Sequence, residues 1–158
     1  MAIKPNTKDT TLTISRIFNA KREAVFKAWT DPQALIRWFA PSDDFATPIA
    51  EVDLRVGGRY RIQIKSPDGR PHTVHGTYRE VTFPVRLVFT WAWEEESCRG
   101  EMPPEQETLV TVEFHERGGA TELILTHEHF PSVKARDSHQ EGWNGCLSRL
   151  PKAIEFFT

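Results

Sequence analysis

The sequence predicts an α+β domain in which a curved antiparallel sheet of about six to seven strands wraps around a long C-terminal helix. Three observations carry this prediction: two short helical patterns follow a first strand, alternation of period two fills most of residues 48–130, and one long helical pattern closes the chain. A large antiparallel sheet twists strongly and curls around another element. The last helix is long enough to be that element.

The first strand and two short helices occupy residues 11–39. The segment TLTISRIF, residues 11–18, alternates and is rich in β-branched residues, which is typical of a strand. Its inward-facing set includes Arg16, and a buried arginine needs a carboxylate partner or an anionic ligand. KREAVFKAWTDP then places apolar residues at helical spacing until Asp31, and Pro32 suits the first turn of a second short helix, PQALIRWF.

Period-two alternation predicts the rest of the sheet. The expected strands are residues 48–55, 59–65, 72–81, 85–94, 107–116 and 121–130. Gly57-Gly58 and Gly118-Gly119 mark turns between neighbouring strands, as does PDGR at residues 67–70. The segment EESCRGEMPPEQ, residues 95–106, is expected to be a polar loop.

The C-terminal helix is expected over residues 138–157, after a polar connection at residues 131–138. Its inward stripe, at spacings of three and four, is Trp143, Cys146, Leu147, Leu150, Ile154 and Phe157. Gly142, Gly145 and Pro151 each weaken a helix. Missing side chains beside Trp143 let the aromatic residues of the sheet approach closely, which favours the boundary of a cavity over a close-packed core.

Composition narrows the class of protein. The chain has 158 residues, 39% of them apolar and 27% charged, so we expect one domain over residues 11–158 after a flexible tail at residues 1–10. A net charge of -2 without a run of Lys or Arg gives no sign of nucleic-acid binding. Five Trp and ten Phe are many for this length, and aromatic side chains dominate a core or line a pocket.

The expected location is the cytoplasm. Cys98 and Cys146 form no CxxC motif, which indicates free thiols in a reducing compartment. The N-terminal residues lack the apolar run of a secretory signal, and no stretch approaches the length of a membrane span.

Five motifs in order resemble the SRPBCC (START-like, Bet v-like) superfamily, and more narrowly the branch named for the C-terminal domain of heat-shock protein 90 ATPase activator homologues. The motifs are IFNAKREAVFKAWTDPQALIRWF, DLRVGGRYRI, GTYREV, RLVFTW and LTHEHFP…HQEGWNGCLSRL. The resemblance covers residues 11–157. It implies a helix-grip fold, with a deep and mostly apolar cavity between the curved sheet and the C-terminal helix.

The superfamily includes lipid and hormone binders, cyclases, aromatases and co-chaperone domains, so the fold does not choose a function. The chain lacks the separate N-terminal domain of the eukaryotic co-chaperone, and a chaperone partner is therefore not expected.

The segment LILTHEHF carries the most pointed candidate residues. Alternation places His127 and His129 on the face of Leu123 and Leu125, about 7 Å apart along the strand. Both histidines are expected to point toward the cavity, where they could orient a ligand or act as general acid and base. The alternative is that His127 is a hydrogen-bonded residue of the core edge and His129 lies near solvent.

Neither a metal nor a cofactor is predicted. A pair of histidines on one strand face can supply two metal ligands. His75, His139 or Cys146 would have to supply a third ligand, and no spacing in the sequence requires it.

The other candidates are mainly aromatic. Trp91 and Trp93 lie on one face of a strand; core packing is expected for one indole and a cavity wall for the other. The hydroxyls of Tyr60 and Tyr78 could bind the polar end of a ligand or form hydrogen bonds within the sheet. Cys146 is expected to be an inert buried thiol rather than a nucleophile. The residues expected to line the cavity are Trp38, Tyr60, Tyr78, Phe89, Trp91, Trp93, His127, His129, Trp143, Cys146 and Leu147.

Two main hypotheses follow. The favoured one is a small cytosolic protein that binds a hydrophobic or aromatic small molecule, a lipid being one such class, between the sheet and the C-terminal helix. The second is an enzyme of the cyclase, aromatase or hydrolase type that uses His127 or His129 as acid or base. A chaperone-modulating interaction domain is a further alternative, and a homodimer stays open.

Overall fold

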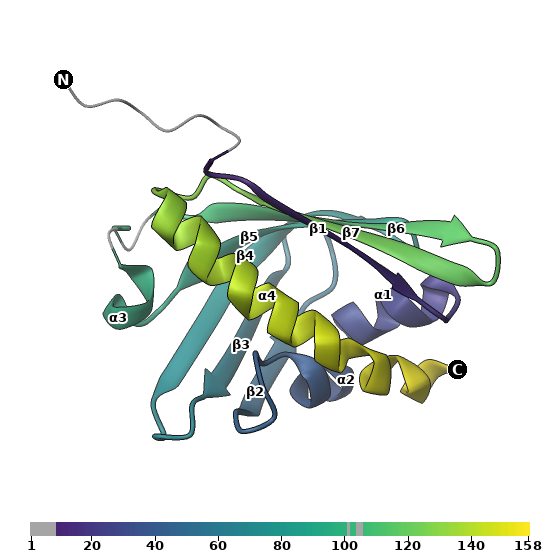
Figure 1. Ribbon diagram of the computed structural model, residues 1–158, viewed down its shortest axis with the longest axis horizontal. Coiled ribbons are helices and arrows are strands. Elements are labelled where there is room, and N and C mark those ends of the chain that lie inside the picture. The colour runs from purple at the N-terminus through teal and green to yellow at the C-terminus, as the bar shows by residue number, and fades with distance from the viewer. Residues whose placement is uncertain (1–8, 101, 104–105) are drawn as a thin grey trace.

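The computed structural model describes residues 9–100, 102–103 and 106–158 (Figure 1). Within these residues the strands are β1 Leu12–Phe18, β2 Ala46–Val52, β3 Arg59–Lys65, β4 Pro71–Thr82, β5 Arg86–Trp93, β6 Thr108–Arg117 and β7 Ala120–Glu128. The helices are α1 Arg22–Thr30, α2 Pro32–Trp38, α3 Glu96–Arg99 and α4 Val133–Ile154, followed by a 3-10 turn η1 Glu155–Phe157.

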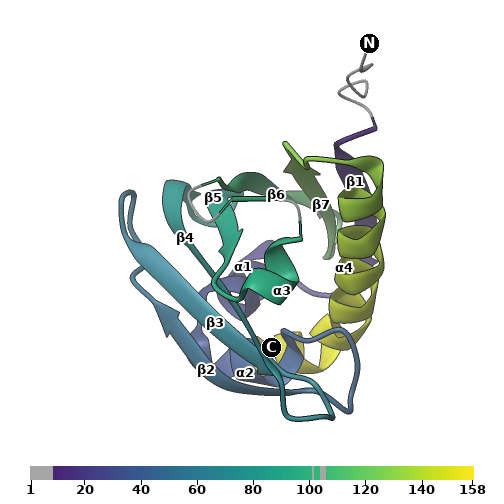
Figure 2. The ribbon, with the colours of Figure 1, turned by 90° about the vertical axis from the view of Figure 1, so that its left-hand side faces the viewer.

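All strands of the described chain form one antiparallel sheet in the order β1-β7-β6-β5-β4-β3-β2. The sheet curls into a half-barrel, and α4 lies along its open side next to β1 (Figure 2). α3 lies at one end of the half-barrel, whereas α1 and α2 lie toward the other end (Figures 1 and 2). The predicted α+β helix-grip architecture is confirmed.

Alternation determines which side chains face α4. In β7 the buried residues are Thr121, Leu123, Leu125 and His127, each separated by a partly exposed neighbour. β1 pairs with β7 so that Leu12 lies opposite His127 and Ile14 opposite Leu125. The inward faces of the two strands therefore form one surface that is mostly apolar and carries His127 at one end.

The end of the half-barrel that holds α1 and α2 is tightly packed. Trp38 is fully buried, and its Nε1 donates a hydrogen bond of 2.8 Å to the Ala28 carbonyl oxygen. Its ring centroid lies 4.8 Å from that of Trp29 in an edge-to-face arrangement. Phe26 packs on Phe114 of β6 at 5.2 Å. These residues join the two short helices to the sheet.

α4 contacts the end of α2 through its backbone and through one arginine. A Cβ added to Gly145 would lie 2.1 Å from the Pro41 carbonyl oxygen, so only glycine permits this approach. Arg149 donates to the carbonyl oxygens of Trp38 and Ala40, both at 3.3 Å, and pairs with Asp43 at 3.0 Å. A cation at the C-terminal end of α2 satisfies carbonyls that the helix leaves unpaired.

Several predicted boundaries were wrong. α4 begins at Val133 and not near Ser138, because the Ser132 hydroxyl accepts a hydrogen bond from the Ala135 amide at 3.1 Å and caps the helix. The predicted polar loop contains the single helical turn α3. β2 ends at Val52, because residues 53–58 form the turn that pairs Val52 with Tyr60.

Two further predictions concern the N-terminal part of the chain. Arg16 is half-buried, and its guanidinium donates to the side-chain oxygen of Asn144 at 2.9 Å, so an amide on α4 takes the place of the expected carboxylate. Of the proposed tail, residues 1–8 lie outside the described residues, while the Thr10 carbonyl accepts from the Phe130 amide at 3.2 Å. Among the described helices, none combines the length and apolar character needed to cross a membrane.

Candidate functional site

A cavity of about 510 Å³ lies between β5 and α4, at the end of the half-barrel that holds α3. Cavities of this size accommodate small organic ligands. Its walls come from β3, β4 and β5, from α3 and α4, from the segment that follows α2 and from the turn between β3 and β4.

The wall formed by the sheet is aromatic. Trp91 and Trp93 of β5 both line the cavity, with ring centroids 5.5 Å apart in an edge-to-face arrangement. Trp143 of α4 faces Trp91 at 5.0 Å, and Phe39 lies edge-on to Trp143 at 5.9 Å. These rings, from β5, α4 and the residue after α2, pack against one another and present one aromatic wall against which an apolar group can pack.

A glycine forms part of the α4 wall. Gly142 lines the cavity, and a Cβ added there would meet no atom within 4 Å outside its own helix neighbours. Gly145, one turn later, is in close contact with Pro41. The two glycines therefore have different functions: Gly145 permits packing, and Gly142 leaves space. The expected close approach of the sheet's aromatic residues was wrong at both glycines, because backbone fills the position at Gly145 and nothing lies within 4 Å of an added Cβ at Gly142.

His127 is a structural residue behind the cavity wall. Its Nδ1 accepts a hydrogen bond from Trp143 Nε1 at 3.1 Å, so the neutral ring carries its proton on Nε2. Nε2 lies 2.6 Å from the Thr108 hydroxyl, which in turn donates to the Trp91 carbonyl oxygen at 3.2 Å. Burial lowers the pKa of His127 well below its ordinary value, and the ring stays neutral. Both nitrogens are occupied, which contradicts the predicted ligand-orienting or acid/base role.

His129 lies outside the cavity. β7 ends at Glu128, and His129 has a φ of 75°, in the left-handed region, which turns its side chain away from the face of His127. The side chain is 63% exposed and lies 3.7 Å from the Glu128 carboxylate. The prediction that both histidines point inward was wrong at this position because the alternation stops with the strand.

His139 lines the cavity instead, although the sequence suggested it only as a third metal ligand. Its Nε2 accepts from Trp93 Nε1 at 3.1 Å, and its Nδ1 donates to the Ala135 carbonyl oxygen at 2.7 Å. Burial lowers the pKa of His139. The ring therefore fixes the orientation of Trp93 rather than exchanging a proton.

Three predicted residues line a separate and much smaller space. Tyr60, Tyr78 and Phe89 surround a volume of about 20 Å³ next to Trp91, which is room for about one water molecule. The Tyr60 hydroxyl donates to the Thr90 carbonyl oxygen at 2.5 Å, and burial raises the pKa of both tyrosines. Neither tyrosine lines the large cavity, in contrast to the prediction.

Trp38 and Leu147 also lie outside the large cavity. Both are buried in the core, and Trp38 belongs to the packed end described above. Cys146 lines the cavity, where burial raises the pKa of its thiol to about 12. Of the predicted residues, the structure thus brings Trp91, Trp93, Trp143 and Cys146 together around one space.

Two buried indoles keep unpaired donors. Within the described part of the chain, Trp91 Nε1 and Trp29 Nε1 have no hydrogen-bond partner. Trp91 lines the large cavity and the small space, and Trp29 lines the small space. A buried N–H without a partner costs about 1–3 kcal/mol, so an acceptor at either position stabilises the protein.

The cavity also has a polar wall that was not predicted from the sequence. Cys98 of α3 and His72 of β4 both line the cavity, and the Cys98 Sγ lies 3.0 Å from His72 Nδ1. His72 Nε2 lies 3.4 Å from the Ser66 hydroxyl. Along the chain, His72 is 26 positions from Cys98 and six positions from Ser66. No spacing indicates this cluster, because it depends on where α3 folds back.

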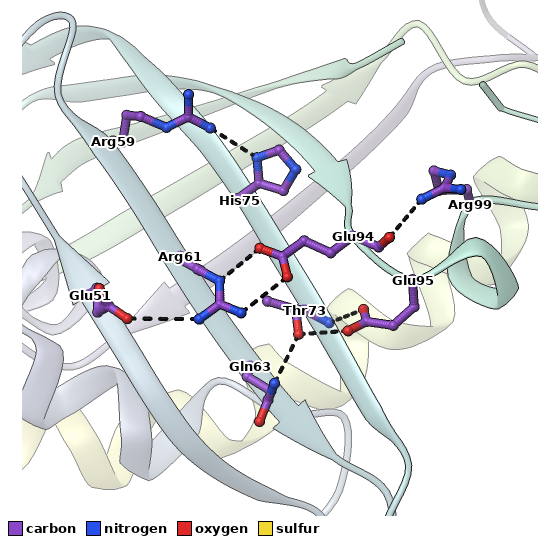
Figure 3. Close-up of polar contacts among 9 residues, drawn as sticks. All are labelled: Glu51, Arg59, Arg61, Gln63, Thr73, His75, Glu94, Glu95 and Arg99. Atoms are coloured by element: carbon purple, nitrogen blue, oxygen red, sulfur yellow. Dashed lines mark hydrogen bonds and ion pairs between the residues drawn. The ribbon is translucent and has the colours of Figure 1, made fainter. Parts of the chain in front are cut away.

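A polar network on the outer surface of the sheet holds α3 in place (Figure 3). The Glu95 carboxylate accepts from both the amide and the hydroxyl of Thr73 on β4. The Arg61 Nε on β3 donates to Glu94 at 2.7 Å, and Arg99 of α3 donates to the Glu94 carbonyl oxygen at 2.6 Å. The segment bearing Cys98 is therefore fixed to two strands.

No group of three or more His, Cys, Asp or Glu side chains among the described residues is arranged to hold a metal ion.

The comparisons place the chain among related proteins. The sequence profile of the family described as Activator of Hsp90 ATPase homolog 1-like protein matches residues 19–155. A comparison with curated proteins gives no match.

Solved structures share the fold over nearly their whole length. A protein from Chromobacterium violaceum is 25% identical, with a TM-score of 0.81 over 92% of this chain and 97% of that one. The AHSA1 protein from Silicibacter pomeroyi is 25% identical, with a TM-score of 0.77 over 94% and 99%. The AHSA1-like protein from Aeromonas hydrophila is 30% identical, with a TM-score of 0.67 over 91% and 92%.

Proposed function

The chain belongs to the Activator of Hsp90 ATPase homolog 1-like family, part of the SRPBCC superfamily, and from this premise we propose that it binds a small hydrophobic or aromatic molecule between β5 and α4. The observation that carries the proposal is the cavity of about 510 Å³ between Trp91, Trp93 and Trp143. The absent side chain at Gly142 keeps it open.

Three candidate histidines, His127, His129 and His139, support a binding role over acid/base chemistry. His127 and His139 use both ring nitrogens in hydrogen bonds within the protein, and His129 faces solvent. Free thiols at Cys98 and Cys146 fit the cytoplasmic location that we propose for the protein.

Filling the cavity from α4 tests this function. A Gly142→Leu substitution places a side chain in open space and replaces a poor helix former, so the fold is expected to stay at least as stable. Glu141→Leu adds the same side chain at the neighbouring exposed position and serves as the matched control.

The measurement is isothermal titration calorimetry with 2-naphthol, together with native mass spectrometry of freshly purified protein. Gly142→Leu is expected to weaken 2-naphthol binding by about tenfold or more, which is about 1.4 kcal/mol. Any co-purifying small molecule is expected to be lost with it, while Glu141→Leu leaves both unchanged. Equal affinity in wild type and Gly142→Leu would overturn the proposed site.

A further inference from the structure

We propose that Cys98 is a reactive nucleophile that adds to electrophilic, carbonyl-activated double bonds of ligands held in the cavity, with His72 as its base. The proposal rests on the proposed binding function and names the ligand class: planar aromatic molecules that carry an α,β-unsaturated carbonyl group. Cys98 and His72 meet at the polar wall of the cavity, whereas Trp91, Trp93 and Trp143 form its aromatic wall.

Hydrogen bonds behind His72 orient its ring. Ser66 donates its hydroxyl hydrogen to the Asp68 carboxylate in a short hydrogen bond, so the Ser66 oxygen can accept from His72 Nε2 at 3.4 Å. In the neutral ring the proton then resides on Nε2. The unprotonated Nδ1 faces the Cys98 Sγ at 3.0 Å, which is the arrangement needed to take the thiol proton.

The base is needed because the thiol is protonated at rest. Burial raises the pKa of Cys98, so its proton must leave as the sulfur attacks. Cys146 on the opposite wall is buried too, with a thiol pKa raised to about 12, and none of the hydrogen bonds described for it involves a histidine. The cavity thus presents one thiol with a base and one without.

The addition is balanced without any further reactant. The Cys98 sulfur forms a bond to the β-carbon of the ligand, and the electron pair of the double bond moves toward the carbonyl oxygen. The thiol proton passes to His72 Nδ1 and from there to the α-carbon. The product is a thioether, and the ring, Ser66 and Asp68 return to their starting states.

Two probes of the same shape separate binding from reaction. N-phenylmaleimide carries the activated double bond, whereas N-phenylsuccinimide is its saturated counterpart and can bind only. Adduct formation is followed by intact-protein mass spectrometry and peptide mapping, and N-phenylsuccinimide binding by calorimetry. Glutathione at the same pH gives the reference rate of an unassisted thiol.

Wild type is expected to form one adduct at Cys98, faster than glutathione, and none at Cys146. His72→Ala is expected to slow the reaction at Cys98 by about tenfold or more, with the rate measured at saturating N-phenylmaleimide so that a change in binding does not contribute. Added imidazole is expected to restore part of the rate, which a purely structural role of His72 does not predict. Gly142→Leu is expected to suppress both binding and reaction.

Three results would overturn the inference: reaction at Cys146 in place of Cys98, an unchanged rate in folded His72→Ala protein, or a rate below that of glutathione. If N-phenylsuccinimide still binds in any of these cases, the binding function survives and the nucleophile does not. If N-phenylsuccinimide does not bind wild type and does not slow labelling, the proposed site for aromatic ligands fails first.

Discussion

At the end of the half-barrel that holds α1 and α2, Trp38 is fully buried and its Nε1 bonds to Ala28 within the core. At the end that holds α3, Trp93 is half-buried, faces a cavity, and gives its Nε1 to His139. Both indoles are satisfied, and both belong to an aromatic cluster. They differ in what covers them: two helices at one end, and a single helical turn at the other.

The difference teaches that the aromatic content of this chain does not itself produce a cavity. Next to the cavity, backbone reaches α4 where Gly145 admits Pro41. At Gly142 nothing lies within 4 Å of an added Cβ, and Glu94 and Glu95, directly before α3, bond to β3 and β4. The spacing of the covering elements decides whether a tryptophan packs or lines a cavity.

The largest expected effect contrasts the two tryptophans. Trp38→Ala removes a fully buried indole and is expected to lower the free energy of unfolding by about 3–5 kcal/mol. Trp93→Ala enlarges an existing cavity. Its loss of free energy of unfolding is expected to be at least about 2 kcal/mol smaller than that of Trp38→Ala, because much less packing is lost. Urea denaturation of both variants measures the difference; equal losses would mean that the two ends are equally packed.

The next effect concerns two histidines of the open end, His127, which is buried, and His139, which is half-buried. Burial lowers the pKa of His127 and His139 in the folded protein, so below the ordinary pKa of about 6.5 the unfolded chain binds more protons than the folded one. Stability is therefore fully present above about pH 7 and is lost as pH falls toward 5, by up to about 1.4 kcal/mol per pH unit for each histidine.

Urea denaturation at pH 7.5 and pH 5.0 checks this pH dependence. His139→Gln is expected to reduce the pH-dependent loss, because one of the two histidines no longer contributes. A stability that does not change between these pH values would contradict the neutral, buried state of both rings.

The smallest effect contrasts the two glycines of α4. Gly145→Ala forces a methyl group against the Pro41 carbonyl and is expected to destabilise the protein by about 1–3 kcal/mol. Gly142→Ala enters open space and is expected to stabilise it by about 0.5–1 kcal/mol through helix propensity. Thermal denaturation should therefore shift in opposite directions, and a shift of the same sign in both variants would remove the distinction between the two positions.

Periodicity in the sequence was enough to predict the sheet, the helix order and the inward position of His127, because buried residues repeat every second position in β7. It could not show that both ring nitrogens of His127 form hydrogen bonds, since its partners Thr108 and Trp143 come from other elements. It failed at His129, because the strand ends one residue earlier.

Periodicity in the sequence could not predict the polar wall of the cavity. α3 lies in a segment with the composition of a loop, and its position depends on pairing with β3 and β4. The capped start of α4 was readable in principle, because Ser132 is a favoured N-cap residue directly before the helix.

The attachment of α3 makes one wall of the cavity sensitive to ionic strength. Arg61 and Glu94 form an ion pair whose side chains are 39% and 36% exposed, and such pairs weaken as added salt screens them. The opposite wall, on α4, rests mainly on buried apolar side chains, which screening by salt does not weaken. Raising the salt concentration is therefore expected to affect the α3 wall more than the α4 wall.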